Sequence, residues 1–276
     1  MNAKQQKEYW LKVERLRVQL DDKYSSLFNV AIKKDLEQFA NDVKTFGVKG
    51  ALSMMGSYAW NEDMIDIMRK LYKEVAVLFG NAVYRAIGIM NRKSASSPFN
   101  DLWVQEAINF LIQYGFTLVA NITQTTKTKL QEIISKGMEE GKGIDEIVRE
   151  ILSDETIGYS MMRARRIART EVMRASNYAS MIAVQEHDFE VDKIWISRKD
   201  NRTRRIPKNN YDHYNMDGQK VPYNEVFVSL GKKGDVVLAD FPGDPTTPAG
   251  FTINCRCTVG FEGRRDENGR LIRKIR

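Results

Sequence analysis

The sequence predicts an α+β protein: a predominantly helical N-terminal half followed by a small α+β domain with a short sheet and long loops. Two observations lead to this prediction. Apolar residues recur at three- and four-residue steps as far as about residue 186, the period of amphipathic helices. Five of the six prolines, both histidines and both cysteines lie beyond residue 160, and short alternating segments follow residue 191. We expect a helical region at 1–140, an α+β domain at 141–263 and a basic tail at 264–276.

The first helical pattern covers residues 5–46 and predicts one long helix or a closely spaced pair. Val13, Leu16 and Leu20 begin its apolar face, and Gly47 and Gly50 are the first stop signals. A second helix is expected near Asn61, a good N-cap residue. Its apolar face ends before a break at 94–98, where serines precede a proline.

A third helix should begin at Asn100 or Asp101, and a separate shorter helix should cover 125–136. The glycines of segment 137–143 have neither the spacing of a phosphate-binding loop nor a preceding strand. They predict instead a glycine C-cap before a helix at 144–152.

The last long helix is expected at 159–186, with one clean face of small and medium apolar residues. Arg163, Arg166 and Arg174 fall away from that face. They form either a solvated surface or a surface that faces nucleic acid or a partner protein. Beyond it, four segments have strand patterns, at 193–198, 225–229, 235–241 and 256–261, and turns rich in Gly, Pro, Asn and Asp separate them.

The composition is that of a globular protein: 42% of the 276 residues are hydrophobic and 29% are charged. No apolar run is long enough for a transmembrane helix, residues 1–12 lack the apolar segment of a signal peptide, and two cysteines fit a reducing compartment. Residues 1–160 carry 21 Lys and Arg against 21 Asp and Glu, whereas residues 161–276 carry 22 against 15. The basic second half indicates either an anionic partner or a surface charged only for solubility.

Cys255 and Cys257 are the first candidates for chemistry. On a strand, side chains two residues apart share a face, so both sulfurs would meet one surface. They are either buried reduced cysteines or two ligands of a zinc ion, with His213 and a carboxylate such as Asp200 or Asp217 completing a tetrahedral set. The spacing matches none of the common zinc motifs, which use C-x2-C pairs.

Segment 198–205 is the second candidate, because five of its eight residues are basic and Lys208 follows closely. Its cations would bind phosphates without reading base sequence. Alternatively they pair internally with Asp217, Asp240 and Asp244 and hold an irregular loop together. The candidate DNA-binding residues are Arg198, Lys199, Arg202, Arg204, Arg205 and Lys208.

Catalytic signatures are weak. His213 beside Asp212 or Asp217 resembles a general-base pair, but no nucleophile motif accompanies it. Acids such as Asp200 and Glu171 with Lys199 are residue types found in nuclease sites, although a chain this rich in charge supplies such sets easily. We therefore assign no catalytic residue and no cofactor.

A series of short motifs, in order, covers about ninety residues of the second half. It begins with Ile-Ala-Arg-Thr-Glu on the last long helix, continues through the basic loop and ends with Asn-Cys-Arg-Cys. Its members are Arg169, Thr170, Glu171, Trp195, Asp200, His213, Asp217, Gly218, Pro242, Gly243, Asn254, Cys255 and Cys257. This series resembles the phage Mu F-like minor head protein family, also called phage head morphogenesis proteins, over roughly residues 140–262. One departure is visible, because segment 206–212 looks like an insertion.

The resemblance implies a minor capsid protein of a tailed double-stranded DNA phage or prophage, and not an enzyme. It implies portal protein, scaffold and major capsid protein as partners, non-specific contact with double-stranded DNA, and no membrane. It also implies assembly in the host cytoplasm followed by a place in the virion head. The neutral helical half suits docking to head proteins and the basic half suits packaged DNA. The alternatives are a DNA-processing or modifying enzyme with a Cys/His/Asp metal site, and a cytosolic DNA-binding protein unrelated to virions.

Overall fold

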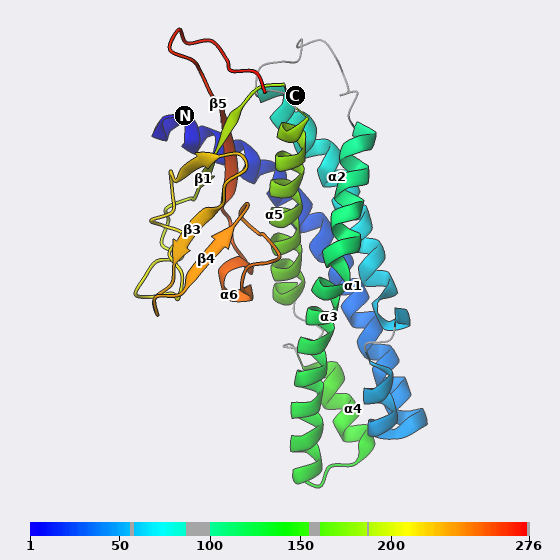
Figure 1. Cartoon of the computed structure of the whole chain (residues 1–276). Coiled ribbons are helices and arrows are strands. Elements are labelled where there is room, and N and C mark those ends of the chain that lie inside the picture. Colours follow the sequence, from blue (N-terminus) through cyan, green and yellow to red (C-terminus); the bar gives the residue numbers. More distant parts are fainter. Residues whose placement is uncertain (56–57, 87–99, 155–160, 187, 275–276) are drawn as a thin grey trace. The chain divides into compact units, whose positions relative to one another are not determined.

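The computed structural model describes residues 1–55, 58–86, 100–154, 161–186 and 188–274. Helices dominate the first part of the chain and two small antiparallel sheets follow, so the predicted α+β fold class is confirmed (Figure 1). Among the described residues, no helix has both the length and the apolar character that a bilayer crossing needs.

The first two helices extend beyond their expected limits. The helices of the structure are α1 (Ala3–Met54), α2 (Tyr58–Ala86), α3 (Asn100–Glu139), α4 (Ile144–Ser153), α5 (Met161–Gln185) and α6 (Ala249–Thr252). Gly47 has φ 70° and ψ 171°, a conformation that only glycine adopts readily, so two helical segments meet there within α1. Asn61 lies inside α2 rather than at its N-cap, and the break expected at 94–98 falls outside the described residues.

Helix α3 corrects the prediction of two separate helices in this region. It runs without interruption from Asn100 to Glu139 and includes the segment 125–136. No proline lies in this stretch, and the isolated Gly115 costs a helix only about 1 kcal/mol relative to alanine. Local sequence therefore offers no reason for the helix to end before residue 137.

The turn between α3 and α4 confirms the predicted glycine C-cap. Gly141 has φ 70°, and the N–H of Lys142 donates to the Gly137 carbonyl at 2.9 Å. The Glu146 carboxylate then accepts the N–H of Gly143, the residue that precedes α4, at 3.0 Å. The glycines serve helix ends and form no phosphate loop.

The chain forms two compact units, and each is built from separated segments. The first contains Met1–Leu20, Leu71–Asn109 and Arg169–Arg276, and the second contains Asp21–Lys70 and Phe110–Ala168. The second unit is helical, and its fully buried side chains include Tyr24, Phe28, Leu36, Phe39, Met68, Leu130 and Ile151. The boundaries at residues 140 and 263 expected from sequence remain predictions.

The first unit holds both sheets. Strand β1 (Val191–Ile196) is central, with β2 (Lys220–Pro222) on one side and β5 (Thr258–Gly263) on the other, both antiparallel to it. Strand β2 has no counterpart in the predicted segments. Because β1 is paired on both sides and buried at five of six positions, it is the core strand of this unit.

Strands β3 (Phe227–Leu230) and β4 (Val236–Ala239) form a separate antiparallel hairpin (Figure 1). Segment 264–274, expected to be an exposed tail, returns along the sheet. The N–H of Glu190 donates to the Ile272 carbonyl at 2.9 Å, and the N–H of Lys274 donates to the Asp188 carbonyl at 2.8 Å. Backbone pairing thus holds this basic segment, which composition alone does not indicate.

Candidate functional site

The site is built on the long loop that joins β1 to β2. Backbone pairing closes the loop at its base: the N–H of Gly218 donates to the Trp195 carbonyl at 2.8 Å and the Trp195 N–H donates to the Gln219 carbonyl at 2.9 Å. An Asp217 carboxylate oxygen accepts the Ser197 N–H at 2.7 Å. The two ends of the loop are therefore fixed beside β1, and the basic residues lie between them.

Asp200 organises the basic part of this loop. Its carboxylate accepts both terminal nitrogens of Arg256, at 2.7 Å and 2.6 Å, and also the N–H of Arg202 and the hydroxyl of Thr203. The hydrogen bonds from Arg256 are the main reason that the pKa of Asp200 lies well below its usual range. A planar guanidinium that meets a carboxylate at two points also fixes orientation, so this pair joins the loop to the segment before β5.

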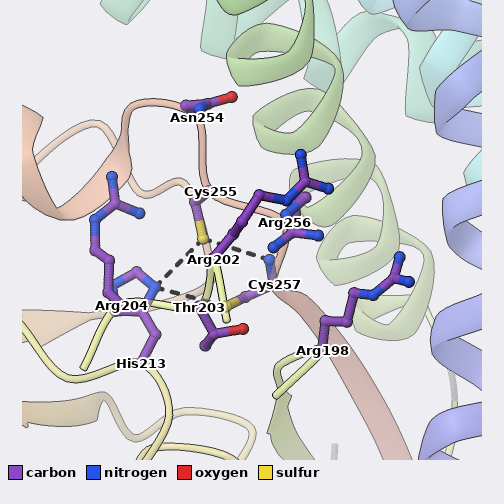
Figure 2. A pocket seen from close by; sticks show the side chains of 9 residues that line it. All are labelled: Arg198, Arg202, Thr203, Arg204, His213, Asn254, Cys255, Arg256 and Cys257. Carbon is purple, nitrogen blue, oxygen red and sulfur yellow. Dashed lines mark hydrogen bonds between the residues drawn. The ribbon is translucent and has the colours of Figure 1, made fainter. Parts of the chain in front are cut away.

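His213, Cys255 and Cys257 converge and are all buried. The Nδ1 atom of His213 lies 3.4 Å from the Cys255 sulfur and 3.5 Å from the Cys257 sulfur. Both cysteines are free thiols. Figure 2 shows the histidine ring turned toward both sulfurs, while the side chain of Asn254 points away from them. The sequence named these three residues as candidates, and the fold brings them together.

The two cysteines precede β5 and do not lie on a strand, so alternation along a strand is not what aligns them. Asn254 has φ 59°, in the left-handed region that asparagine tolerates, and the N–H of Cys257 donates to the Cys255 sulfur at 3.3 Å. A tight turn thus points both sulfurs to one side. This corrects the expected strand at 256–261, since β5 begins at Thr258.

The two thiols differ in acidity. A hydrogen bond from Cys257 is the main reason that the pKa of Cys255 lies well below its usual value, and the nearby His213 acts in the same direction. Burial raises the pKa of Cys257 well above the usual value.

The mouth of the site is basic. A small pocket of about 20 Å³ lies here, which is room for a single water molecule. Besides the cysteines and His213, its lining includes Arg198, Arg202, Thr203, Arg204, Asn254 and Arg256 (Figure 2). The buried cluster therefore adjoins a small basic pocket with room for a compact ligand such as a water molecule.

The six candidate DNA-binding residues divide into two groups. Three have partners inside the protein: Arg198 pairs with Asp200 at 3.1 Å, Lys199 pairs with Asp217 at 3.0 Å, and Arg204 donates to the Ile253 carbonyl. The others, Arg202, Arg205 and Lys208, are exposed, and no carboxylate among the described residues pairs with their side chains. Asp240 and Asp244, also considered as partners, do not pair with this loop: Asp240 lies 3.6 Å from Lys193, and Asp244 accepts N–H groups of its own turn.

The carboxylates proposed to complete a zinc set lie elsewhere. Asp200 is engaged with Arg256 and Arg198, and Asp217 with Lys199 and the Ser197 N–H. Among the residues the structure describes, the group of possible ligands contains His213, Cys255 and Cys257 alone. In the possible nuclease set, Glu171 is likewise engaged, since it pairs with Arg174.

The remaining motif residues tie helix α5 to the loops. The Thr170 hydroxyl accepts the Asn254 N–H at 2.9 Å, and Arg169 donates to the Asn254 side chain at 3.0 Å. Gly243 has φ 96°, and an added Cβ would lie 3.0 Å from the Arg174 Cα, so only glycine fits this close approach. Its carbonyl accepts Arg174 Nε at 2.8 Å. These motifs form one network around the loop that carries Cys255.

The burial of three polar residues in this network was not predicted from the sequence. Arg174, expected either on a solvated surface or on one that faces nucleic acid or a partner protein, is buried against Glu171 and Gly243. Arg17 of α1 donates to Ser176, to the Asn177 side chain and to the Cys257 carbonyl. Asn177 in turn donates to the Pro242 carbonyl at 2.7 Å and accepts the Val259 N–H at 3.1 Å. No pattern in the sequence marked these polar residues as buried.

The comparison with protein families is consistent with this network. The family described as phage Mu protein F like protein matches residues 128–260, the segment that contains the motif series, the site and all five strands except the end of β5. No curated protein and no solved structure gives a significant match. On the ordered motifs and on this match, residues 128–260 of the chain are similar to the phage Mu protein F-like family, and this similarity supports a structural role in phage head morphogenesis.

Proposed function

We propose that this protein is a minor capsid protein that attaches to the portal and neighbouring head proteins and touches packaged DNA without reading its sequence. It would act in the host cytoplasm during assembly and remain in the virion head. The family match supports the head role, and the observation that carries the attachment is an exposed apolar face on the β3–β4 hairpin.

The hairpin face is defined by Val228, Leu230, Val236 and Leu238. Their exposed fractions are 42%, 64%, 59% and 54%. They are also direct cross-strand neighbours, since Val228 pairs with Leu238 and Leu230 with Val236. The alternate residues, Phe227, Ser229, Val237 and Ala239, are buried. One side of the hairpin therefore packs inward while the other presents a continuous aliphatic surface, a common mark of protein–protein contact.

Replacing Leu230 and Leu238 with lysine should abolish this attachment. Two charges in the middle of an apolar contact would have to be desolvated without partners, which should weaken portal binding at least about tenfold. The measurement is capture of the protein by immobilised portal protein at moderate salt.

A matched control is the pair Ile112→Lys and Met138→Lys, because both side chains lie on α3 and are exposed at 63% and 65%. The control should bind portal like the parent protein. If the hairpin variant were captured as well as the parent protein, the hairpin would not be part of the interface. Failure of the parent protein to bind any head protein would overturn the attachment itself.

The DNA contact is assigned to Arg202, Arg205 and Lys208, the exposed cations of the β1–β2 loop. Arg205 also lies over the Tyr214 ring, with its guanidinium carbon 4.4 Å from the ring centroid, which holds it at the surface. Since the neighbouring Arg198 and Lys199 are paired with carboxylates, these three are the cations of the loop best placed to reach phosphates.

Binding to linear duplex DNA should weaken steeply as salt rises, because cations that neutralise phosphates release counterions. Changing Arg202, Arg205 and Lys208 to glutamine should reduce the slope of log affinity against log salt by about 0.9 for each phosphate that the variant no longer neutralises. The control removes the same charge from exposed helical lysines: Lys44, Lys49 and Lys70. An unchanged slope in the loop variant, or an equal reduction in the control, would show that DNA does not bind this loop. DNA cleavage on addition of divalent metal would instead favour the enzyme alternative.

A further inference from the structure

We propose that His213, Cys255 and Cys257 form a binding site for one zinc ion. The donor set is one imidazole nitrogen and two sulfurs, the combination that selects zinc among the common divalent cations. This inference is independent of the portal and DNA contacts proposed above.

The two nitrogen–sulfur distances match those of a tetrahedral site. With metal–sulfur bonds of about 2.3 Å and metal–nitrogen bonds of about 2.0–2.1 Å, a sulfur and a nitrogen ligand should lie about 3.5 Å apart. The two sulfurs lie 3.4 Å and 3.5 Å from Nδ1 of His213. All three donor atoms fall within 4.8 Å of one another.

The surroundings of His213 also favour its role as a metal ligand. Its ring is packed edge-on by Phe251 and Trp195, with centroids 4.4 Å and 5.4 Å away. Nε2 is buried and finds no hydrogen-bond partner among the described residues. The ring therefore makes its polar contacts through Nδ1, to two sulfurs that are weak hydrogen-bonding groups. A buried imidazole held this way is poorly satisfied by the thiols alone, and a metal ion between the three groups accounts for its orientation.

The charges also balance. Two thiolates neutralise one divalent cation, so the centre adds no net charge beside Arg204 and Arg256. Asp200 and Asp217 are already engaged, and the adjoining pocket has space for one water molecule. We therefore assign water as the fourth ligand.

The ion would serve the fold of this domain. His213 belongs to the β1–β2 loop, whereas the cysteines lie just before β5. Coordination would fix this long loop to the neighbour of the core strand, in a unit whose two sheets are small. Because zinc would bind the folded chain through deprotonated thiols, its binding free energy would add to folding stability.

The first test uses the full-length protein with reduced thiols, stripped of metal by chelation and dialysed against zinc. We expect one zinc per chain by elemental analysis. Cobalt in place of zinc should give the near-ultraviolet sulfur-to-metal charge-transfer band and the intense visible bands of a tetrahedral thiolate site. Substoichiometric zinc with a cobalt spectrum lacking the thiolate band would overturn the proposal, as would a disulfide between the cysteines in freshly prepared protein.

The second test compares H213N and C257S with H187N, which removes the chain's other histidine. The first two variants should lose stoichiometric zinc, and H187N should keep it. Chelation should lower the melting temperature of the parent protein and of H187N, and zinc should restore it. In C257S neither treatment should shift the melting temperature. Zinc retention by folded C257S or H213N would contradict the assignment of ligands.

Discussion

Replacing Glu171 with alanine should lower the free energy of unfolding by about 3–5 kcal/mol, the usual cost of removing one partner of a buried ion pair. Both partners are nearly inaccessible, since the side chains of Arg174 and Glu171 are each 5% exposed. Tyr72 donates to the other Glu171 oxygen at 3.1 Å. Without the carboxylate, the guanidinium keeps its bond to the Gly243 carbonyl but remains a buried charge without a counter-ion. Urea denaturation at neutral pH measures the loss.

Asp66→Asn is the matched control, because Arg69 and Asp66 also form an i,i+3 pair but are 47% and 51% exposed. Exposed pairs contribute about 0–1 kcal/mol, so this variant should unfold close to the parent protein. If Glu171→Ala unfolded like Asp66→Asn, the buried pair would not be a structural requirement of the α5 network. The presence of a glutamate at this position of the motif would then need another explanation.

Replacing Trp195 with alanine should cost about 3–5 kcal/mol, the range for deleting a large aromatic side chain from a core. Trp195 is fully buried in the central strand β1. Its indole meets the rings of Phe227 and His213 edge-on, with centroids 5.3 Å and 5.4 Å away, and that of Phe251 at 5.8 Å. One side chain thus supports the hairpin, the β1–β2 loop and α6 together.

Thermal unfolding followed by near-ultraviolet circular dichroism tests this prediction. The small sheet domain should lose its aromatic signal at a lower temperature, while Trp195→Phe should retain much of the stability because it keeps an aromatic ring in the core. Phe46→Ala, at a side chain that is 58% exposed, should change little. If the Trp195→Ala variant were as stable as the parent, the rings of Phe227, His213 and Phe251 would be able to fill the cavity that the indole leaves.

Several features followed from the sequence alone. Periodicity located the long helical segments, because three- and four-residue steps place apolar side chains on one helix face, although it divided α3 into two helices. The glycines after residue 136 predicted the α3–α4 turn correctly, since positive φ is a local requirement. The ordered motifs predicted the resemblance to the phage Mu F-like family, and the model of that family matches residues 128–260. His213, Cys255 and Cys257 could be named as candidates because their side-chain chemistry is distinctive.

Tertiary structure decided which charges are buried and which groups meet. The sequence does not distinguish Arg174 from Arg202, yet Arg174 is buried against Glu171 and Arg202 is exposed on a loop. The outward aliphatic face of the β3–β4 hairpin depends on which of the two alternating sets of side chains packs against the core. The convergence of His213 with the cysteines depends on a tight turn at Asn254 and on a loop closed at Gly218. A local sequence pattern indicates the structure that a single segment favours. Burial and long-range pairing are decided only when segments far apart in the chain pack together in one core.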